Sequence, residues 1–233
     1  YRDKDIKRIA CRVFINLGMN AVELLQMPRL RPENLDRHFK ITGRENLDNA
    51  LSRGKGVIML TSHLGNWEYM GAYFALKGYK GSVIARRIYY KPYDMFLRKL
   101  RSSAGVLSID RNSSVRRMIK ILKGNGILGI LPDQDTNKVS GIFIKFLGFP
   151  AYTPTGPVAL AKSTEAAIVP SFIVRKNGYH HIYVEEPIRI VDTGNKAETL
   201  RINTEQWSGV VEKYVCKYPE QWVWMHRRWR TKE

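Results

Sequence analysis

The sequence predicts an α/β fold in which a mostly parallel central sheet is flanked by helices and follows an N-terminal helical segment. From about residue 55 onward, short apolar runs alternate with runs whose apolar residues recur at helical spacing. This order is typical of parallel strands joined by right-handed helical crossovers. Residues 127–131 are continuously apolar, as in a parallel strand covered on both faces. With 233 residues the chain suits one domain, which we divide into a helical segment, 1–50, and an α/β domain, 51–233.

The elements follow from local patterns. The first segment is basic, and Val13, Leu17 and Leu24 give it a partly amphipathic helical pattern that Pro28 and Pro32 interrupt. Five elements are expected next: a strand at Val57–Leu60, a helix at 66–76, a strand at 82–85, a helix at 92–102 and a strand at 106–109. The helix at 113–123 has the clearest periodicity, with basic residues opposite its apolar face. After the strand at 127–131 we expect a helix at 156–162, a strand at 168–174, a hairpin turn at Asn177-Gly178, a strand at 181–184 and a helix at 200–217.

The composition restricts the partners and the compartment. The chain carries 39 Lys and Arg against 21 Asp and Glu, a net charge of +18, which suits nucleic acid, an anionic membrane, or an acidic soluble protein or ligand. Cys11 and Cys216 form no disulfide framework and no zinc-binding spacing, in agreement with a reducing compartment. No run approaches the ~18 apolar residues of a membrane span, and no signal peptide is recognisable. Because the first residue is Tyr1, we expect a truncated or processed product.

The stretch Thr61-Ser62-His63-Leu64-Gly65-Asn66-Trp67-Glu68 is the most informative part of the chain. A histidine at a strand end can act as a general base, and a carboxylate one turn into the next helix can fix its tautomer. Residues five apart in one helix lie about 140° apart, so His63 and Glu68 meet only if His63 precedes the helix. Gly65 and Asn66 supply the turn and cap that this requires. We therefore expect a His63–Glu68 pair.

Other polar residues also follow apolar runs. Asp110-Arg111 and Asp133-Gln134-Asp135 each come after a predicted strand, and ligands of open α/β sheets gather at the carboxyl ends of strands. No Gly-rich phosphate-binding loop is present. His180 and His181 are adjacent on a strand and point to opposite faces. We therefore expect neither a metal nor a cofactor.

An ordered series of motifs extends from about residue 40 to the C-terminus. They are His-Leu-Gly-Asn-Trp-Glu at 63–68, Leu-Arg-Ser-Ser and Ile-Asp-Arg within 98–111, Leu-Pro-Asp-Gln-Asp at 131–135, Phe-Ile-Lys-Phe-Leu-Gly-Phe-Pro-Ala at 143–151, Thr-Pro-Thr-Gly-Pro at 153–157, Val-Pro at 169–170, and Pro-Glu-Gln-Trp-Val-Trp-Met-His-Arg-Arg-Trp at 219–229. This series resembles the late acyltransferases of lipid A biosynthesis, the lauroyl and myristoyl transferases of Gram-negative bacteria. They belong to the glycerolipid acyltransferase superfamily, which an H-x-x-x-x-D/E motif marks. Family members usually begin with a membrane-spanning helix, which this sequence does not show.

The resemblance implies a glycerolipid-acyltransferase-like fold and a function in lipopolysaccharide biosynthesis at the cytoplasmic face of the bacterial inner membrane. It implies acyl transfer from a thioester, normally on an acyl carrier protein, to a hydroxyl of a lipid A precursor. His63 would take the hydroxyl proton and Glu68 would orient His63, without a covalent enzyme intermediate. The acyl thioester would be a co-substrate, and no other cofactor is implied.

The resemblance also implies residues that bind substrate. They are Asn66, Arg101, Arg111, Asp133, Gln134 and Asp135. Arg101 and Arg111 match basic positions of the family's second motif, and arginine suits the phosphates and carboxylates of the acceptor. Residues 133–135 occupy the place of the third motif, where an acidic residue holds the acceptor or a loop.

The basic helix at 113–123 and the aromatic, basic tail at 222–230 suit an anionic membrane surface or an acidic carrier protein; Trp222 or Trp224 also suits the core. Three alternatives stay open. One is an acyltransferase that uses a phosphatidylinositol mannoside acceptor and acyl-coenzyme A. The second is a basic module that binds nucleic acid or membrane without catalysis, although the basic residues are scattered and no RNA-binding aromatic pattern appears, so we expect no nucleic acid partner. The third is a hydrolase, although Ser62 lies in no G-x-S-x-G elbow.

Overall fold

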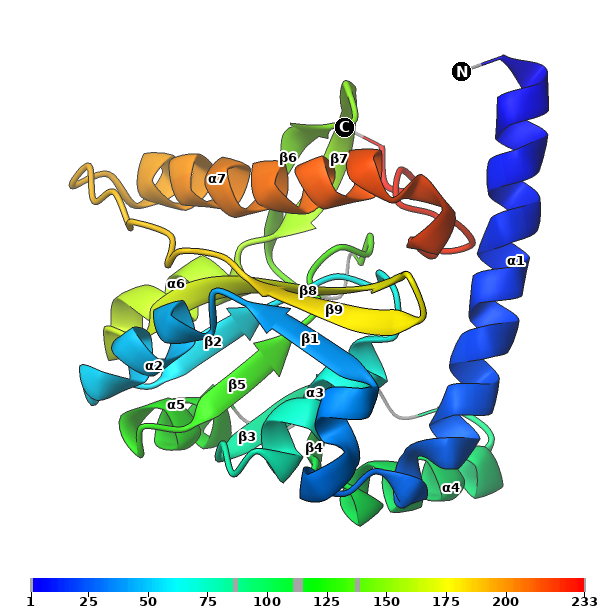
Figure 1. Ribbon diagram of the computed structural model, residues 1–233. Helices are drawn as coiled ribbons and strands as arrows, with labels where there is room; N and C mark the ends of the chain where they lie inside the picture. The colour runs from blue at the N-terminus through cyan, green and yellow to red at the C-terminus, as the bar shows by residue number, and fades with distance from the viewer. Residues whose placement is uncertain (1, 86–87, 111–114, 137–138, 233) are drawn as a thin grey trace.

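The structure is a computed structural model that describes residues 2–85, 88–110, 115–136 and 139–232. Its main sheet has seven strands: β1 Phe39–Thr42, β2 Val57–Leu60, β3 Gly81–Ala85, β4 Leu107–Asp110, β5 Ile127–Ile130, β8 Ala167–Lys176 and β9 Tyr179–Val184. They lie in the order β1-β9-β8-β2-β5-β3-β4 (Figure 1). The five strands from β8 to β4 pair in parallel. The predicted α/β class with a mostly parallel sheet is confirmed.

The predicted hairpin is also confirmed. β8 and β9 pair antiparallel through Asn177 and Gly178, which both have positive φ angles of 51° and 77°, as a tight hairpin turn requires. A second hairpin, β6 Gly141–Phe146 with β7 Phe149–Pro154, lies outside the main sheet and was not predicted.

The prediction that residues 1–50 are wholly helical is wrong at β1. The helices of this segment are α1 Asp3–Gln26, η1 Met27–Arg29, η2 Pro32–Arg37 and α2 Arg44–Ser52. Between η2 and α2, β1 pairs in parallel with β9 at the edge of the main sheet. In β1, Phe39 is buried and Lys40 is exposed, the alternation of a half-buried strand. These four residues are too few for that period to stand out among helical neighbours.

The remaining helices agree with the predicted ones to within a few residues. They are α3 Trp67–Leu76, α4 Lys91–Ser103, α5 Val115–Lys123, α6 Gly156–Thr164 and α7 Lys196–Lys217. The short η3 Pro219–Gln221 was not predicted. Residues 113–114 of the helix predicted at 113–123 lie outside the described residues.

Helices cover both faces of the sheet. In β2, Val57 and Met59 join the core cluster that contains the buried residues of α3, whereas Ile58 and Leu60 join the cluster that contains those of α7. Figure 1 shows α3 and α7 on opposite sides of the strands. Every residue of β2 is therefore buried, which explains the uninterrupted apolar run in the sequence.

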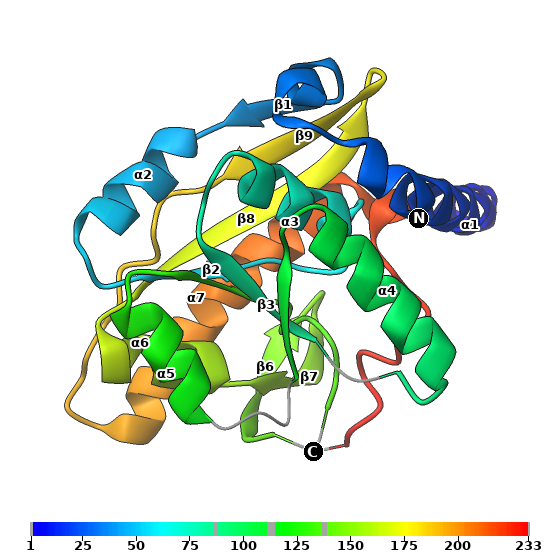
Figure 2. The ribbon, with the colours of Figure 1, turned by 90° about the horizontal axis from the view of Figure 1, so that it is seen from below.

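Helix α1 stands at one side of the molecule, opposite α2, α5 and α6 (Figure 2). Helix α1 packs against η1 and α3, and it also contacts η3 near the C-terminus. Among the described residues, no helix combines the length and the apolar character that crossing a bilayer requires.

Candidate active site

His63 lies in the loop between β2 and α3, at the carboxyl end of a central strand, as predicted. Gly65 turns this loop with a φ of +59°, and a Cβ atom there would lie 2.1 Å from the carbonyl oxygen of Ile173, so only glycine fits. The Asn66 side chain accepts a hydrogen bond of 3.2 Å from the Tyr69 amide and caps α3. The turn and the cap together place His63 before the helix.

The carboxylate that contacts the imidazole is Asp133. Its Oδ1 lies 2.7 Å from Nδ1 of His63. Its Oδ2 accepts hydrogen bonds from the His63 backbone amide at 2.8 Å and from Trp222 Nε1 at 2.9 Å. The Asp133 side chain is fully buried. A buried carboxylate with three donors is held in one orientation, and it holds the imidazole in turn.

The prediction that Glu68 makes this contact is corrected by the structure. Glu68 is the second residue of α3, and its carboxylate accepts hydrogen bonds of 2.7 and 2.5 Å from the Arg101 guanidinium on α4. It also accepts one of 3.2 Å from Trp67 Nε1. A position inside the helix directs Glu68 toward α4, whereas Asp133 leaves the strand that neighbours β2. Arg101, which was predicted to bind substrate, is thus paired with Glu68.

The charges around His63 favour its protonated form. Burial lowers the pKa of His63, but the charge and hydrogen bond of Asp133 and the charge of Glu68 outweigh it, so the pKa lies above its ordinary value. Burial alone would raise the pKa of Asp133, yet the charge of His63 and the hydrogen bonds from its ring and backbone hold this pKa well below its usual range. Asp133 is therefore ionised at neutral pH, and Nδ1 of His63 carries a proton.

The other residues of the third motif have different surroundings. The Gln134 side-chain nitrogen lies 3.2 Å from Nε2 of His63. Asp135 accepts two hydrogen bonds of 2.7 Å, from the backbone amide and the hydroxyl of Thr231. Asp135 therefore secures the C-terminal segment rather than facing His63. The predicted site residue Arg111 lies outside the described residues.

The C-terminal segment closes over the histidine loop. Trp222, 1% exposed, pairs with Leu64 in an isolated β-bridge. The Val223 amide donates to the His63 carbonyl at 3.0 Å. The prediction that a tail tryptophan joins the core is confirmed for Trp222, whereas Trp224 is 40% exposed. Sequence reasoning missed that Trp222 donates to Asp133, because no local pattern records a contact across 89 residues.

His226 is a second histidine near the site that the sequence analysis did not single out. Its ring lies 5.9 Å from that of His63 and 4.7 Å from that of Trp222. Burial lowers its pKa to about 4, against the opposing charge of Asp133. His226 is therefore neutral at physiological pH.

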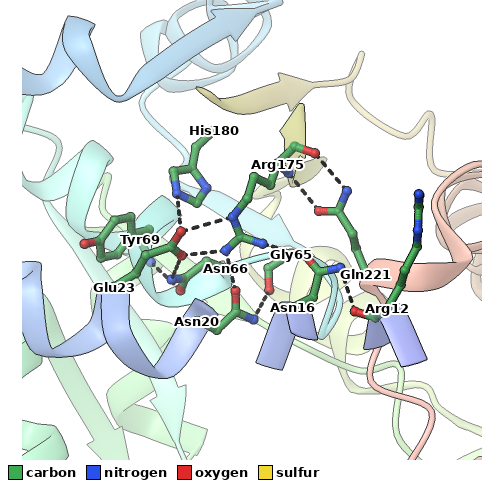
Figure 3. Close-up of polar contacts among 10 residues, drawn as sticks. All are labelled: Arg12, Asn16, Asn20, Glu23, Gly65, Asn66, Tyr69, Arg175, His180 and Gln221. Atoms are coloured by element: carbon green, nitrogen blue, oxygen red, sulfur yellow. Dashed lines mark hydrogen bonds and ion pairs between the residues drawn. The ribbon is translucent and has the colours of Figure 1, made fainter. Parts of the chain in front are cut away.

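A buried polar network supports the loop from the side of α1 (Figure 3). Arg175 on β8 donates to Glu23 on α1 at 3.0 and 2.7 Å, and His180 lies 3.1 Å from the same carboxylate. Asn20 on α1 donates to the Gly65 carbonyl at 2.6 Å. These contacts connect α1 and the sheet to the loop that carries His63, and sequence analysis missed them because they join residues over 40 positions apart.

The prediction that Asn66 binds substrate does not fit this network. Asn66 is 2% exposed, and its Nδ2 donates to Glu23 at 2.7 Å while its oxygen caps α3. Both ends of the amide are therefore engaged in holding the loop.

A cavity of about 760 Å³ opens beside His63. Its polar wall contains His63, Gln134 and Arg101, and Met59, Met70 and Leu97 contribute to its apolar wall. A cavity lined by apolar side chains together with polar groups suits a ligand that has a hydrocarbon part and a reactive polar group. The geometry combines a polarised imidazole with such a cavity, which suits general-base chemistry on a lipid.

The chain is similar to several known proteins. The family model for bacterial lipid A biosynthesis acyltransferases matches residues 2–231. The lipid A biosynthesis lauroyltransferase of Escherichia coli is 26% identical over 243 residues, which cover 99% of this chain and 74% of that protein. The phosphatidylinositol mannoside acyltransferase of Mycobacterium tuberculosis is 26% identical over 171 residues, which cover 70% of this chain. The match spans about half of the mycobacterial protein, 53%.

Among solved structures, the 1-acyl-sn-glycerophosphate acyltransferase PlsC of Thermotoga maritima aligns with a TM-score of 0.44 and 15% identity. The alignment covers 89% of this chain and 88% of that chain.

The network around Glu23 predicts a pH-dependent contribution to stability. Burial raises the pKa of Glu23, but hydrogen bonds from His180, Arg175 and Asn66 lower it to about 2. A depressed pKa stabilises the fold above the unfolded value of 4.5, and this contribution, about 3 kcal/mol, is lost as the pH falls toward 2. Urea unfolding from pH 7 to pH 3 should show it, and Glu23→Gln should remove that part of the slope.

At pH 7, Glu23→Gln should also reduce the free energy of unfolding by about 3–5 kcal/mol, because it leaves the Arg175 guanidinium buried without a charged partner. The matched control is Glu205→Gln, which removes an exposed ion pair with Arg201 and should change stability by at most about 0.5 kcal/mol. Equal effects of the two substitutions would contradict the role assigned to the network.

Proposed function

Because the chain belongs to the bacterial lipid A biosynthesis acyltransferase family, we propose that it transfers a fatty acyl chain from an acyl thioester to a hydroxyl group of a lipid A precursor. The donor is the thioester of an acyl carrier protein. The transfer needs no co-reactant besides this thioester. The single observation that supports the proposal most strongly is the Asp133-bound imidazole of His63 beside a cavity of about 760 Å³ with many apolar side chains in its wall.

In the proposed reaction the apolar cavity holds the acyl chain, and the thioester carbonyl lies at its polar end near His63. The acceptor hydroxyl hydrogen-bonds to Nε2 of His63, which takes its proton as the oxygen attacks the carbonyl carbon. The carbon–sulfur bond then breaks, and the departing sulfur takes the proton from Nε2. The acceptor oxygen is the direct nucleophile, so no covalent enzyme intermediate forms.

Two carboxylates divide the work that the sequence analysis gave to Glu68 alone. Asp133 fixes the tautomer of His63 and stabilises the imidazolium that forms during attack. Glu68 holds the Arg101 guanidinium at the cavity wall, and its charge adds to that of Asp133 in raising the pKa of His63. Arg101 and Arg111 bind the anionic groups of the acceptor.

The enzyme works at the cytoplasmic face of the bacterial inner membrane, against an anionic lipid surface. Large apolar side chains are exposed on α1, on α4 and the loop before it, and on the C-terminal segment: Phe14, Tyr90, Phe96 and Trp224. Together with the net charge of +18, they suit a headgroup layer, where aromatic rings and basic side chains both find partners.

The acidic carrier protein docks on the exposed basic face of α5. This face carries Arg116, Arg117, Lys120 and Lys123. Complementary charge steers the encounter of such partners.

A second candidate has the same chemistry with a different acceptor and donor. The 26% identity to the mycobacterial phosphatidylinositol mannoside acyltransferase favours a mannoside acceptor. The acyl donor in this candidate function is acyl-coenzyme A. The His63–Asp133 pair would serve both reactions, so the two candidate functions are distinguished by which acceptor and donor the enzyme uses.

Mass spectrometry of the acceptor lipid tests the function. The purified chain is incubated with a lipid A precursor or a phosphatidylinositol mannoside, and with carrier-protein or coenzyme A thioesters of several chain lengths. We expect one added acyl chain on the lipid A precursor with the carrier-protein thioester. His63→Ala should lower the rate by at least about 10²–10⁴-fold, the usual contribution of a general base. Near-normal turnover of this variant would refute the assignment of His63.

Asp133→Asn tests the corrected orienting residue. Without the Asp133 charge, burial dominates and the pKa of His63 falls, so the acidic limb of the pH–rate profile should move to lower pH. The turnover number should fall by up to about 10⁴-fold, because an amide oxygen no longer stabilises the imidazolium. Glu68→Gln serves as the comparison and should cost less. If the acidic limb of the pH–rate profile stayed in place in Asp133→Asn, this result would contradict the pairing of His63 with Asp133.

A further inference from the structure

The lone pair of the catalytic base is already engaged in this structure. Both oxygens of Asp133 accept hydrogen bonds, and the one from Nδ1 of His63 fixes the tautomer with the proton on Nδ1. In the neutral imidazole, the form that acts as a base, Nε2 is therefore the acceptor, and the side-chain nitrogen of Gln134 lies 3.2 Å from it. An amide N–H group pointing at this lone pair completes the hydrogen bonding of the imidazole.

The Gln134 nitrogen thus occupies the place of the attacking oxygen. A hydroxyl that transfers its proton to Nε2 must lie about 2.6–3.2 Å from it. The acceptor hydroxyl can reach this position only when the Gln134 amide moves aside. Gln134 is half-buried and lines the same cavity as His63, so rotation of its side chain leaves the amide next to the reacting atoms.

We propose that Gln134 is a catalytic residue that covers Nε2 of His63 in the resting enzyme and then donates its amide N–H groups to the oxyanion formed from the thioester carbonyl. This inference rests on the proposed function. The carbonyl carbon lies about 3–3.5 Å from the attacking oxygen before reaction. An amide displaced from Nε2 by that oxygen therefore remains within hydrogen-bond reach of the carbonyl oxygen.

Two other residues of the cavity wall have donors that are engaged with carboxylates. The Arg101 guanidinium donates to Glu68, and the Thr231 hydroxyl and amide donate to Asp135. The Gln134 amide instead contacts Nε2 of His63, and the acceptor hydroxyl displaces the amide from this contact when it binds. Its N–H groups become available at the moment when the acceptor hydroxyl binds.

The proposed step is balanced. The acceptor oxygen forms a bond to the carbonyl carbon and gives its proton to Nε2, while the π electrons of the carbonyl move to its oxygen, which Gln134 stabilises. When the carbonyl re-forms, the carbon–sulfur bond breaks. The sulfur leaves with its electron pair and takes the proton from Nε2 as a thiol.

Steady-state kinetics of Gln134→Ala and Gln134→Glu test this role, with the donor and acceptor on which the wild-type chain acts. Loss of an oxyanion donor should lower kcat and kcat/KM together by about 10²–10³-fold in both variants. In Gln134→Glu the added carboxylate should also raise the pKa of His63 and move the acidic limb of the profile to higher pH. The matched control is Gln26→Ala, which changes an exposed glutamine at the end of α1 and should keep wild-type kinetics.

Two results would overturn the inference while leaving the proposed function intact. A kcat of Gln134→Ala equal to or above the wild-type value would mean that Gln134 only covers the base. An unchanged kcat with a raised acceptor KM would mean that it only binds the acceptor. An inactive wild-type chain, by contrast, would contradict the proposed function and this inference together.

Discussion

The hydrogen bond between His63 and Asp133 depends on the order of the strands. β2 and β5 are parallel neighbours, with Leu60 opposite Ile130, and each of the two side chains comes three residues after its strand residue. The Thr61 amide continues the pairing by donating to the Ile130 carbonyl at 2.9 Å. Because parallel strands end at the same edge of a sheet, the base and its carboxylate meet there although 70 positions separate them. The tautomer of His63 therefore depends on β2 and β5 being neighbours in the sheet.

Both ends of the chain hold the loop that carries His63. From the N-terminal side, Asn20 and Glu23 of α1 contact Gly65 and Asn66. From the C-terminal side, Trp222 donates to Asp133, and a bridge joins it to the same loop. Buried charge of this kind stabilises only when every partner is present. The position of the His63 loop therefore depends on α1 and on the C-terminal segment, which do not themselves supply the base. Substitutions in α1 are expected to affect catalysis by displacing His63.

The sequence predicted the parallel strands and their helices because long apolar or amphipathic runs record burial directly. β1 was missed because four residues carry too little of the strand period. The base was found, since a histidine after a buried strand and before a capped helix is a local feature. Its carboxylate was misassigned to Glu68, the nearest acid along the chain, because the choice of Asp133 requires knowing that β5 lies beside β2. The roles of Asn66 and Trp222 were hidden for the same reason: their partners are distant in sequence.

The tautomer of His63 tests the account most directly. In ¹⁵N-histidine-labelled protein, with His63 assigned by comparison with His63→Gln, nuclear magnetic resonance at neutral to mildly alkaline pH distinguishes the protonated nitrogen from the unprotonated one. The account predicts a neutral ring with its proton on Nδ1, a strongly deshielded Nδ1 proton, and loss of that signal in Asp133→Asn. A proton on Nε2, or a spectrum that Asp133→Asn leaves unchanged, would contradict it.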